Sequence, residues 1–300
     1  GALDTANATA QNIDILTTGD VALTWSGAST LDTDVVVFGG SATGVLTVSA
    51  DQALGSFTGT ANSLVISDNI VTANSTTSST ASGNITLVAE SSTIALAGDL
   101  TTGTAIVAGT AGAAEVATSG TISLTAVTGI TGAGVSATGN AQVTTGTGTG
   151  GSDTATSGNI TLNATGAGIV GLSGTNALTI GSATVADGSG STVARTGTIT
   201  VTSADRVNDN TSGGDLDVSF GAVTGADTNT VGTLIITTDG GAGTGGEIQI
   251  TSAEALVVGA LDTANATAQN IDILTTGDVA LTWSGASTLD TDVVVFGGSA

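Results

Sequence analysis

The side chains that could do chemistry in this chain are almost all carboxylates. The sequence holds 25 Asp and Glu residues but no His and no Cys, and its only basic residues are Arg195 and Arg206. Because a Ser or Thr nucleophile needs a neighbouring base such as His or Lys, the composition argues against nucleophilic catalysis. A pair of carboxylates could still hydrolyse a glycosidic bond, so the acidic residues need a closer look.

The densest acidic group is interpreted as solvated surface. It consists of Asp205, Asp209, Asp215 and Asp217. Asp215 and Asp217 flank Leu216, and in a strand this alternation turns the two carboxylates away from the side that buries the leucine. Exposed carboxylates are the ordinary state of Asp, so we expect no catalytic activity and no organic cofactor.

Calcium is the one ligand for which the sequence offers candidates. Ca²⁺ prefers oxygen ligands on turns, and Asp32 with Asp34, and Asp239 ahead of the segment GGAGTGG, could supply them. The last segment is similar to the calcium-binding nonapeptide G-G-x-G-x-D, but Gly245 stands where the Asp is needed. Solvated turn carboxylates are the alternative interpretation.

The overall charge narrows the possible partners. With a net charge of −23, the chain repels nucleic acid and anionic membranes and offers no phosphate-binding patch. No apolar run approaches the roughly 18 residues of a spanning helix. We therefore expect no nucleic-acid partner and no membrane insertion in this stretch.

A long exact repeat organises the chain. Residues 1–42 return letter for letter at residues 259–300, so the period is 258 residues. Residues 1–258 are read as one full repeat and 259–300 as the start of the next, in the same continuous structure. Neighbouring copies are expected to stack end to end.

A shorter repeat lies inside the long one. Segments such as GNITLVA at 83, GTISLTA at 120 and GNITLNA at 158 recur, and about seven sub-repeats averaging about 37 residues fill one period. Weaker apolar triplets, such as those at Ala105 and Ala141, fall halfway between them. The alternation of apolar and polar residues therefore repeats about every 19 residues.

This pattern predicts an all-β chain that forms a parallel β-helix solenoid with about 19 residues per coil. A unit this short cannot bury its own apolar face, but stacked units form a continuous core. We expect right-handed coiling and about 14 coils per long repeat, which would span about 65 to 70 Å. An array of antiparallel β-sandwiches is the alternative, and the abundance of Thr and Gly argues against helices.

The segments SGNITLVA at 82, SGTISLTA at 119 and SGNITLNA at 157 resemble the coils of filamentous-haemagglutinin-like adhesins and related giant bacterial repeat proteins. The resemblance implies an extracellular or cell-surface location and a secreted, rod-like repeat region. The expected function is that of a structural stalk in a giant surface fibre or adhesin, without catalysis. The alternative is a surface-layer or sheath subunit that packs laterally.

Several outward positions depart from a plain solvated face. Val36, Phe38, Val65, Ile106 and Ile235 are apolar where the alternation predicts exposure, and we interpret them as lateral contacts or as residues covered by a fold-back coil. Regular rows of outward Thr on a flat β-helix can organise water as ice does. Here Ser123, Gln142 and Asp217 fall in the same expected column as Thr86, Thr161, Thr179 and Thr200, so we interpret that column as an ordinary polar surface.

Overall fold

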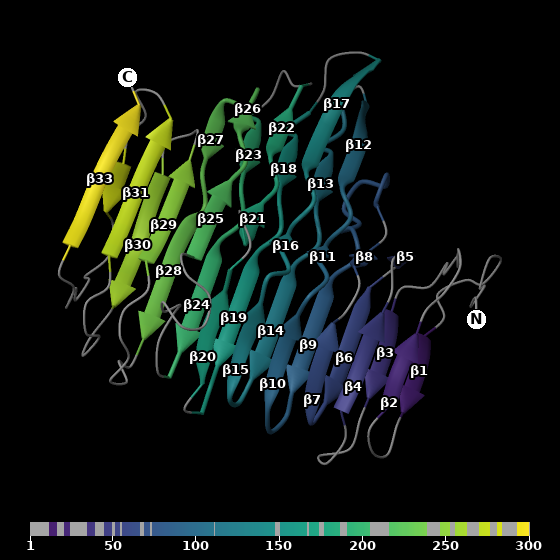
Figure 1. Ribbon diagram of the computed structural model, residues 1–300. Coiled ribbons are helices and arrows are strands. Elements are labelled where there is room, and N and C mark those ends of the chain that lie inside the picture. Colours follow the sequence, from purple (N-terminus) through teal and green to yellow (C-terminus); the bar gives the residue numbers. More distant parts are fainter. Residues whose placement is uncertain are drawn as a thin grey trace.

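The structure of the chain is a computed structural model. It describes residues 12–16, 21–24, 35–39, 45–49, 52–54, 56–66, 69–72, 74–110, 112–147, 151–166, 168–173, 177–186, 191–204, 216–238, 247–252, 256–262, 270–276, 281–283 and 293–299. Regular structure in these residues is β-strand throughout, and every pairing between strands is parallel. The predicted all-β parallel solenoid is confirmed (Figure 1).

The strands stack into five sheets, here named sheets A to E. Sheet A has ten strands and is the longest ladder. Its strands, in stacking order, are β1 (Asn12–Leu16), β3 (Val35–Gly39), β6 (Phe57–Ala61), β9 (Ile85–Ala89), β14 (Ile122–Ala126), β19 (Ile160–Ala164), β24 (Ile199–Ser203), β28 (Thr233–Thr238), β30 (Leu256–Asp262) and β32 (Leu281–Trp283).

Sheets B and C complete the coils that sheet A begins. Sheet B contains β2 (Val21–Thr24), β4 (Val45–Ser49), β7 (Ser63–Ile66), β10 (Thr93–Leu96), β15 (Gly129–Gly132) and β20 (Ile169–Leu172). Sheet C contains β5 (Gln52–Leu54), β8 (Ile70–Thr72), β11 (Leu100–Thr101), β16 (Ser136–Ala137), β21 (Leu178–Ile180), β25 (Leu216–Phe220), β29 (Glu247–Ser252), β31 (Asn270–Thr276) and β33 (Val293–Ser299).

Sheets D and E are shorter and occur only in the middle of the described chain. Sheet D contains β12 (Ala105–Thr110), β17 (Ala141–Thr147), β22 (Ala183–Val185) and β26 (Val223–Thr224). Sheet E contains β13 (Val116–Thr118), β18 (Thr154–Thr156), β23 (Val193–Arg195) and β27 (Thr228–Thr230). The two sheets contact each other and form a second lobe, at the top of Figure 1, beside the main lobe of sheets A to C.

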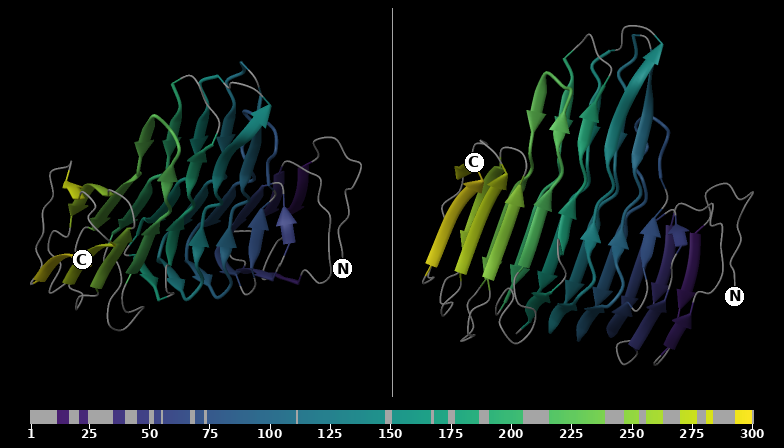
Figure 2. Two further views of the ribbon diagram at one scale, coloured as in Figure 1. Left: turned by 90° about the horizontal axis from the view of Figure 1, so that it is seen from above. Right: turned by 45° about the horizontal axis from the view of Figure 1, so that its top comes forward.

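One complete coil therefore passes through both lobes. From β14 the chain runs through β15 and β16 in the main lobe, crosses to β17 and β18 in the second lobe, and returns to sheet A at β19. The right-hand view of Figure 2 shows these passages side by side in successive coils. Each crossing places a chain segment at the narrow connection between the lobes, which we call the waist.

The coil length differs from the predicted value. In sheet A, Ile85 pairs with Ile122, and Ile122 pairs with Ile160, so a coil here takes 37 or 38 residues. The half-step segments at Ala105 and Ala141 do not begin coils of their own, because they lie in sheet D of the second lobe. A step close to 19 residues occurs only where the second lobe is missing, as between Leu46 and Leu64 in sheet B.

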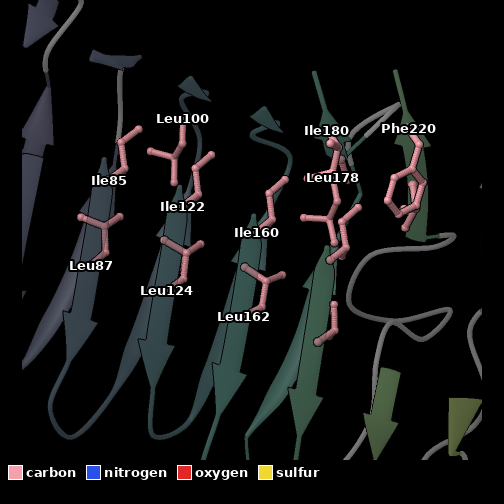
Figure 3. Close-up of a cluster of buried hydrophobic side chains, with 14 of the residues drawn as sticks. Ile85, Leu87, Leu100, Ile122, Leu124, Ile160, Leu162, Leu178, Ile180 and Phe220 are labelled. Atoms are coloured by element: carbon pink, nitrogen blue, oxygen red, sulfur yellow. The ribbon is translucent and has the colours of Figure 1, made fainter. Parts of the chain in front are cut away.

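The inward side chains explain why the lobes differ in size. In the main lobe, columns of Ile and Leu stack from coil to coil with almost no exposure, as Figure 3 shows for Ile85, Ile122 and Ile160. In the second lobe the inward residues are small. They are Ala105, Val107, Ala141, Val143, Ala183 and Val185 of sheet D, and Ala117, Ala155 and Ala194 of sheet E. Ala and Val fill a thinner core than Ile and Leu, so sheets D and E can lie close together.

Glycines make the waist possible. Gly120 and Gly158 occupy the same position in successive coils, directly after a buried Ser. A Cβ added to Gly158 would lie 1.8 Å from the carbonyl oxygen of Gly120, so no larger residue fits without moving the backbone. On the opposite wall of the waist, a Cβ on Gly139 would lie 2.2 Å from the carbonyl oxygen of Gly103.

The edge of the second lobe is covered by the segment 74–81. Ser75 and Ala81 form isolated bridges beneath Ala105 of β12 and Thr118 of β13. The amide of Ser79 donates to the carbonyl of Val116 at 2.9 Å, and the amide of Val116 donates to the Ser78 hydroxyl at 3.0 Å. This segment therefore satisfies backbone groups that an open edge would leave unpaired.

The strands of residues 256–299 pair with those before them. β30 pairs with β28 in sheet A, and β31 pairs with β29 in sheet C. The repeated sequence does not enter the same sheets twice, since β1 and β3 belong to sheet A whereas their sequence counterparts β31 and β33 belong to sheet C. The alternation of apolar and polar residues around Ile13 and Ile15 is compatible with a strand in either sheet.

Candidate functional site

The residues expected to bind calcium are known only from their positions in the sequence. Asp32, Asp34 and Asp239 lie outside the described residues, as do Asp205, Asp209 and Asp215, while Asp217 belongs to β25. Among the residues that the structure describes, no group of three or more His, Cys, Asp or Glu side chains could hold a metal ion. The calcium interpretation therefore stays a prediction.

Two buried acidic residues were not anticipated from the sequence. Asp153 is fully buried and Glu115, in the coil below it, is 8% exposed. The amide of Glu115 donates to Asp153 Oδ1 at 2.8 Å, whereas Asp153 Oδ2 has no hydrogen-bond partner. Ca²⁺ takes six to eight oxygen ligands, so two carboxylates alone do not make a calcium site, and we assign the pair to the stacking of the second lobe.

The five apolar residues expected at lateral contacts are not brought together by the fold. Val65 lies in β7 of sheet B, Ile106 in β12 of sheet D, and Ile235 in β28 of sheet A. Val36 and Phe38 belong to β3 of sheet A, where only the backbone is described. Val65, Ile106 and Ile235 therefore lie in three different sheets, not in one column as the 19-residue period suggested.

Ile106 differs from the other apolar candidates in its exposure. It is 43% exposed, and it is the one exposed large hydrophobic residue among those whose surroundings the structure describes. Its neighbour in the next coil is Gln142, followed by Thr184 and Thr224, all on the outer side of sheet D. Val65 and Ile235 are partly buried. Any lateral apolar contact in the described region would therefore centre on the second lobe.

The waist is held by two ladders of buried hydroxyl groups. On one wall, Ser82, Ser119, Ser157 and Thr196 each accept a hydrogen bond from the glycine amide one coil further on, at distances from 2.6 to 3.2 Å. On the other wall, Thr72, Thr102 and Thr138 do the same at 2.9 to 3.0 Å. The waist lies between strands, and each hydroxyl there supplies a hydrogen bond from one coil to the next. The coils therefore stay hydrogen-bonded at the waist.

The same hydroxyls also tie the two walls together. Thr72 Oγ1 donates to the carbonyl of Gly83 at 2.6 Å, and Thr102 Oγ1 donates to the carbonyl of Gly120 at 3.0 Å. Ser82 Oγ donates across the waist to the carbonyl of Gly103. The recurring Ser-Gly and Thr-Gly dipeptides are the sequence signal of this arrangement. The sequence does not indicate which of these dipeptides face each other across the waist.

A third ladder covers the outer rim of sheet A. Asn84 Oδ1 accepts from the amide of Thr121 at 2.8 Å, and Asn159 Oδ1 accepts from the amide of Thr198 at 2.8 Å. At the edge of sheet D, directly before β17 and β22, Asn140 Oδ1 accepts from the amide of Ser182 in the same way at 2.9 Å. Each of these Asn side chains binds an amide in the coil that follows its own, so the ladder joins successive coils.

The outer face of sheet A is the most regular surface of the described chain. β6, β9, β14, β19 and β24 pair over five residues each without a shift in register. Two rows of partly exposed side chains follow from this register. One row is Thr58, Thr86, Ser123, Thr161 and Thr200, and the other is Thr60, Val88, Thr125, Asn163 and Thr202.

Comparisons with known protein families, with curated proteins and with solved structures found no match. Within the described residues, no helix is long and apolar enough to cross a membrane. The class of protein that the fold defines is a parallel β-solenoid with a two-lobed coil. Two features of this fold bear on function: the hydrogen-bond ladders that join successive coils, and the outward faces of the sheets.

Proposed function

We propose that this chain is the structural repeat region of a giant extracellular surface fibre or adhesin, and that it acts as a rod-like stalk without catalytic activity. The observation that carries the proposal is the ladder of sheet A, whose ten parallel strands run from β1 to β32 with a register shift between β28 and β30. A ladder of this kind transmits load through backbone hydrogen bonds in every coil, and its length grows with each added repeat.

The hydroxyl ladders support a mechanical role. Each coil of the middle region is bound to the next in the main lobe, in the second lobe and at the waist between them. Pulling along the solenoid axis must therefore break several hydrogen bonds at once in each coil. A stalk needs this cooperativity, whereas a catalytic site does not.

The proposal is tested by pulling single molecules of the chain between its ends and by imaging them unloaded. We expect the images to show rods of stacked coils. Under load, the rods should unfold in steps of one or a few coils, at forces higher than those that unfold isolated helices. Compact particles without a long axis, or unfolding at negligible force, would contradict the stalk. A screen against polysaccharides should show no hydrolysis.

The alternative is a surface-layer or sheath subunit that packs laterally, and the exposure of Ile106 favours it. An apolar side chain repeated once per long repeat along a fibre would invite side-by-side contact. Ile106→Ser should then reduce sheet or bundle formation, while Thr144→Ser, on the same outer side of sheet D, should leave it unchanged. Equal bundling in both variants and the parent chain would rule out contact through Ile106.

A further inference from the structure

The two Thr rows on sheet A form a surface that the sequence alone did not predict. In the expected single column, Ser123, Gln142 and Asp217 interrupted the Thr residues. The structure removes two of these interruptions, because Gln142 lies in sheet D and Asp217 lies in sheet C, while Ser123 stays between Thr86 and Thr161. We name the ten residues of the two rows, from β6 to β24, the Thr face.

The Thr face is a two-dimensional array with fixed spacing. Neighbours within a row are one strand apart, about 4.8 Å, and the two rows are two residues apart, about 6.7 Å. Thr is β-branched and stiff at χ1, so its methyl and hydroxyl groups keep similar positions from strand to strand. The array therefore repeats in both directions at distances of the same order as those between water molecules in the surface of an ice crystal.

The composition of the Thr face selects against other ligands. None of its ten positions carries a charge, although the chain has 25 acidic residues, so the face offers nothing to a mineral surface or an ionic ligand. None is aromatic, so there is no platform on which a sugar ring could stack. What remains is an uncharged lattice that can accept and donate hydrogen bonds while contacting methyl groups.

We propose that the Thr face binds ice. The Thr methyl groups favour ordered water over the array, and the hydroxyl groups hydrogen-bond that water in register with the crystal. A surface of solvated Thr without this register would hold only transient water. The proposal goes beyond the stalk function and is independent of it, since a rod can bear load with or without an ice-binding face.

The test uses the purified 300-residue chain and ice itself as the probe. The chain is labelled at its N-terminal amine, its adsorption to a growing ice hemisphere is measured, and its inhibition of ice recrystallisation is titrated. Thr161→Lys with Thr200→Lys places two long charged side chains in the centre of the face. The matched control is Thr144→Lys with Thr184→Lys, two partly exposed positions in adjacent coils of sheet D.

We expect the parent chain and the control to adsorb to ice. The double variant on sheet A should need about ten times the concentration for the same inhibition, as expected when hydrogen-bonding groups are displaced from a bound surface. Absence of ice adsorption by the parent chain overturns the proposal, and so does an equal loss in the control. A double variant that leaves ice adsorption intact but changes the sedimentation of the chain would assign the face to contact between copies instead.

A gain-of-function variant keeps the test decisive if the double variant does not fold. Ser123 and Val88 are the two positions of the β9 and β14 rows that differ from Thr. Ser123→Thr with Val88→Thr should increase the inhibition of recrystallisation at equal concentration, since both rows then run unbroken from β6 to β14. Unchanged inhibition in this variant, with the strand content unchanged by circular dichroism, contradicts the proposal.

Discussion

At the scale of single residues, the buried hydroxyls of the waist bind both to the next coil and across to the opposite wall. Thr102 is 1% exposed, and its Oγ1 both accepts from the amide of Gly139 at 2.9 Å and donates to the carbonyl of Gly120 at 3.0 Å. It thereby links one coil to the next and one wall of the waist to the other. A buried polar group left without a partner costs more than a hydrogen bond gains.

Thr102→Val should therefore destabilise the coil that contains it. Val has nearly the same shape, but it leaves the Gly139 amide and the Gly120 carbonyl unpaired in a buried site, at a cost of about 2 to 3 kcal/mol. Because solenoids can unfold coil by coil, the measurement is amide hydrogen exchange at Gly139 together with denaturant unfolding.

The matched control for this prediction is Thr101→Val. Thr101 is the neighbouring residue in β11 and is partly exposed, so its replacement should change the unfolding free energy by less than about 0.5 kcal/mol. Equal protection of the Gly139 amide in the Thr102 variant and the parent chain would show that the waist hydroxyl is dispensable.

At the scale of strands and coils, the sequence predicted the inward positions well and the coil length poorly. The alternation around Ile85, Ile122 and Ile160 marks buried columns of sheet A, and these residues are buried as expected. The half-step segments at Ala105 and Ala141 have the same alternation, and a period of two residues cannot distinguish a new coil from a second lobe of the same coil. The small size of the inward Ala and Val residues in these segments was the one feature of the sequence that indicated a thinner lobe.

The same ambiguity explains the misplaced surface residues. A period of about 19 residues treats every half-step as a coil, and it therefore places outward residues of sheets A, B, C and D in one apparent column. Thr161 and Gln142 seemed to share a face, yet they lie in different sheets. Which walls face each other depends on long-range pairing across the waist, and that information is not local in the sequence.

The covering segment 74–81 is the element whose removal should have the clearest effect. Ser79 has a positive φ of 63°, and its amide donates to the Val116 carbonyl. Ser79→Pro removes this donor and requires a φ near −65°, so it should detach the segment at a cost of about 3 kcal/mol. Faster amide exchange at Ile106 and Val116, and faster growth of thioflavin-positive aggregates, are the expected results, because the edges of β12 and β13 become open.

Ser79→Gly is the control at the same position. Gly adopts positive φ without strain and keeps the amide donor, so this variant should exchange and aggregate like the parent chain. If the Pro variant also behaves like the parent chain, the segment does not protect the edge.

At the scale of the whole molecule, the two-lobed coil changes the expected dimensions. Among the described residues, nine strands of sheet A begin within the 258-residue repeat, from β1 to β30, whereas the half-step period predicts 14 coils. The second lobe occupies only part of this length, since sheets D and E have four strands each. The repeat therefore contains a thick zone, where the second lobe is present, and a thin zone without it.

The last prediction follows from this arrangement: tandem copies of the repeat should form a rod whose thickness varies with a period of about 43 Å, the rise of nine parallel strands at about 4.8 Å. The residues that close the repeat already continue the ladder, because β30 pairs with β28 and β32 pairs with β30. Each period should carry one second lobe, built from residues equivalent to 105–230.

Electron microscopy of a chain carrying several copies of the 258-residue repeat measures both quantities. The lobe-to-lobe distance should be about 43 Å, and adding one copy should lengthen the rod by the same amount. A rod of even width with an axial repeat of about 65 to 70 Å would instead restore a coil of about 19 residues throughout, since 14 such coils would be needed to use the same 258 residues. The two outcomes differ by more than four strand spacings, so even moderate resolution along the fibre axis separates them.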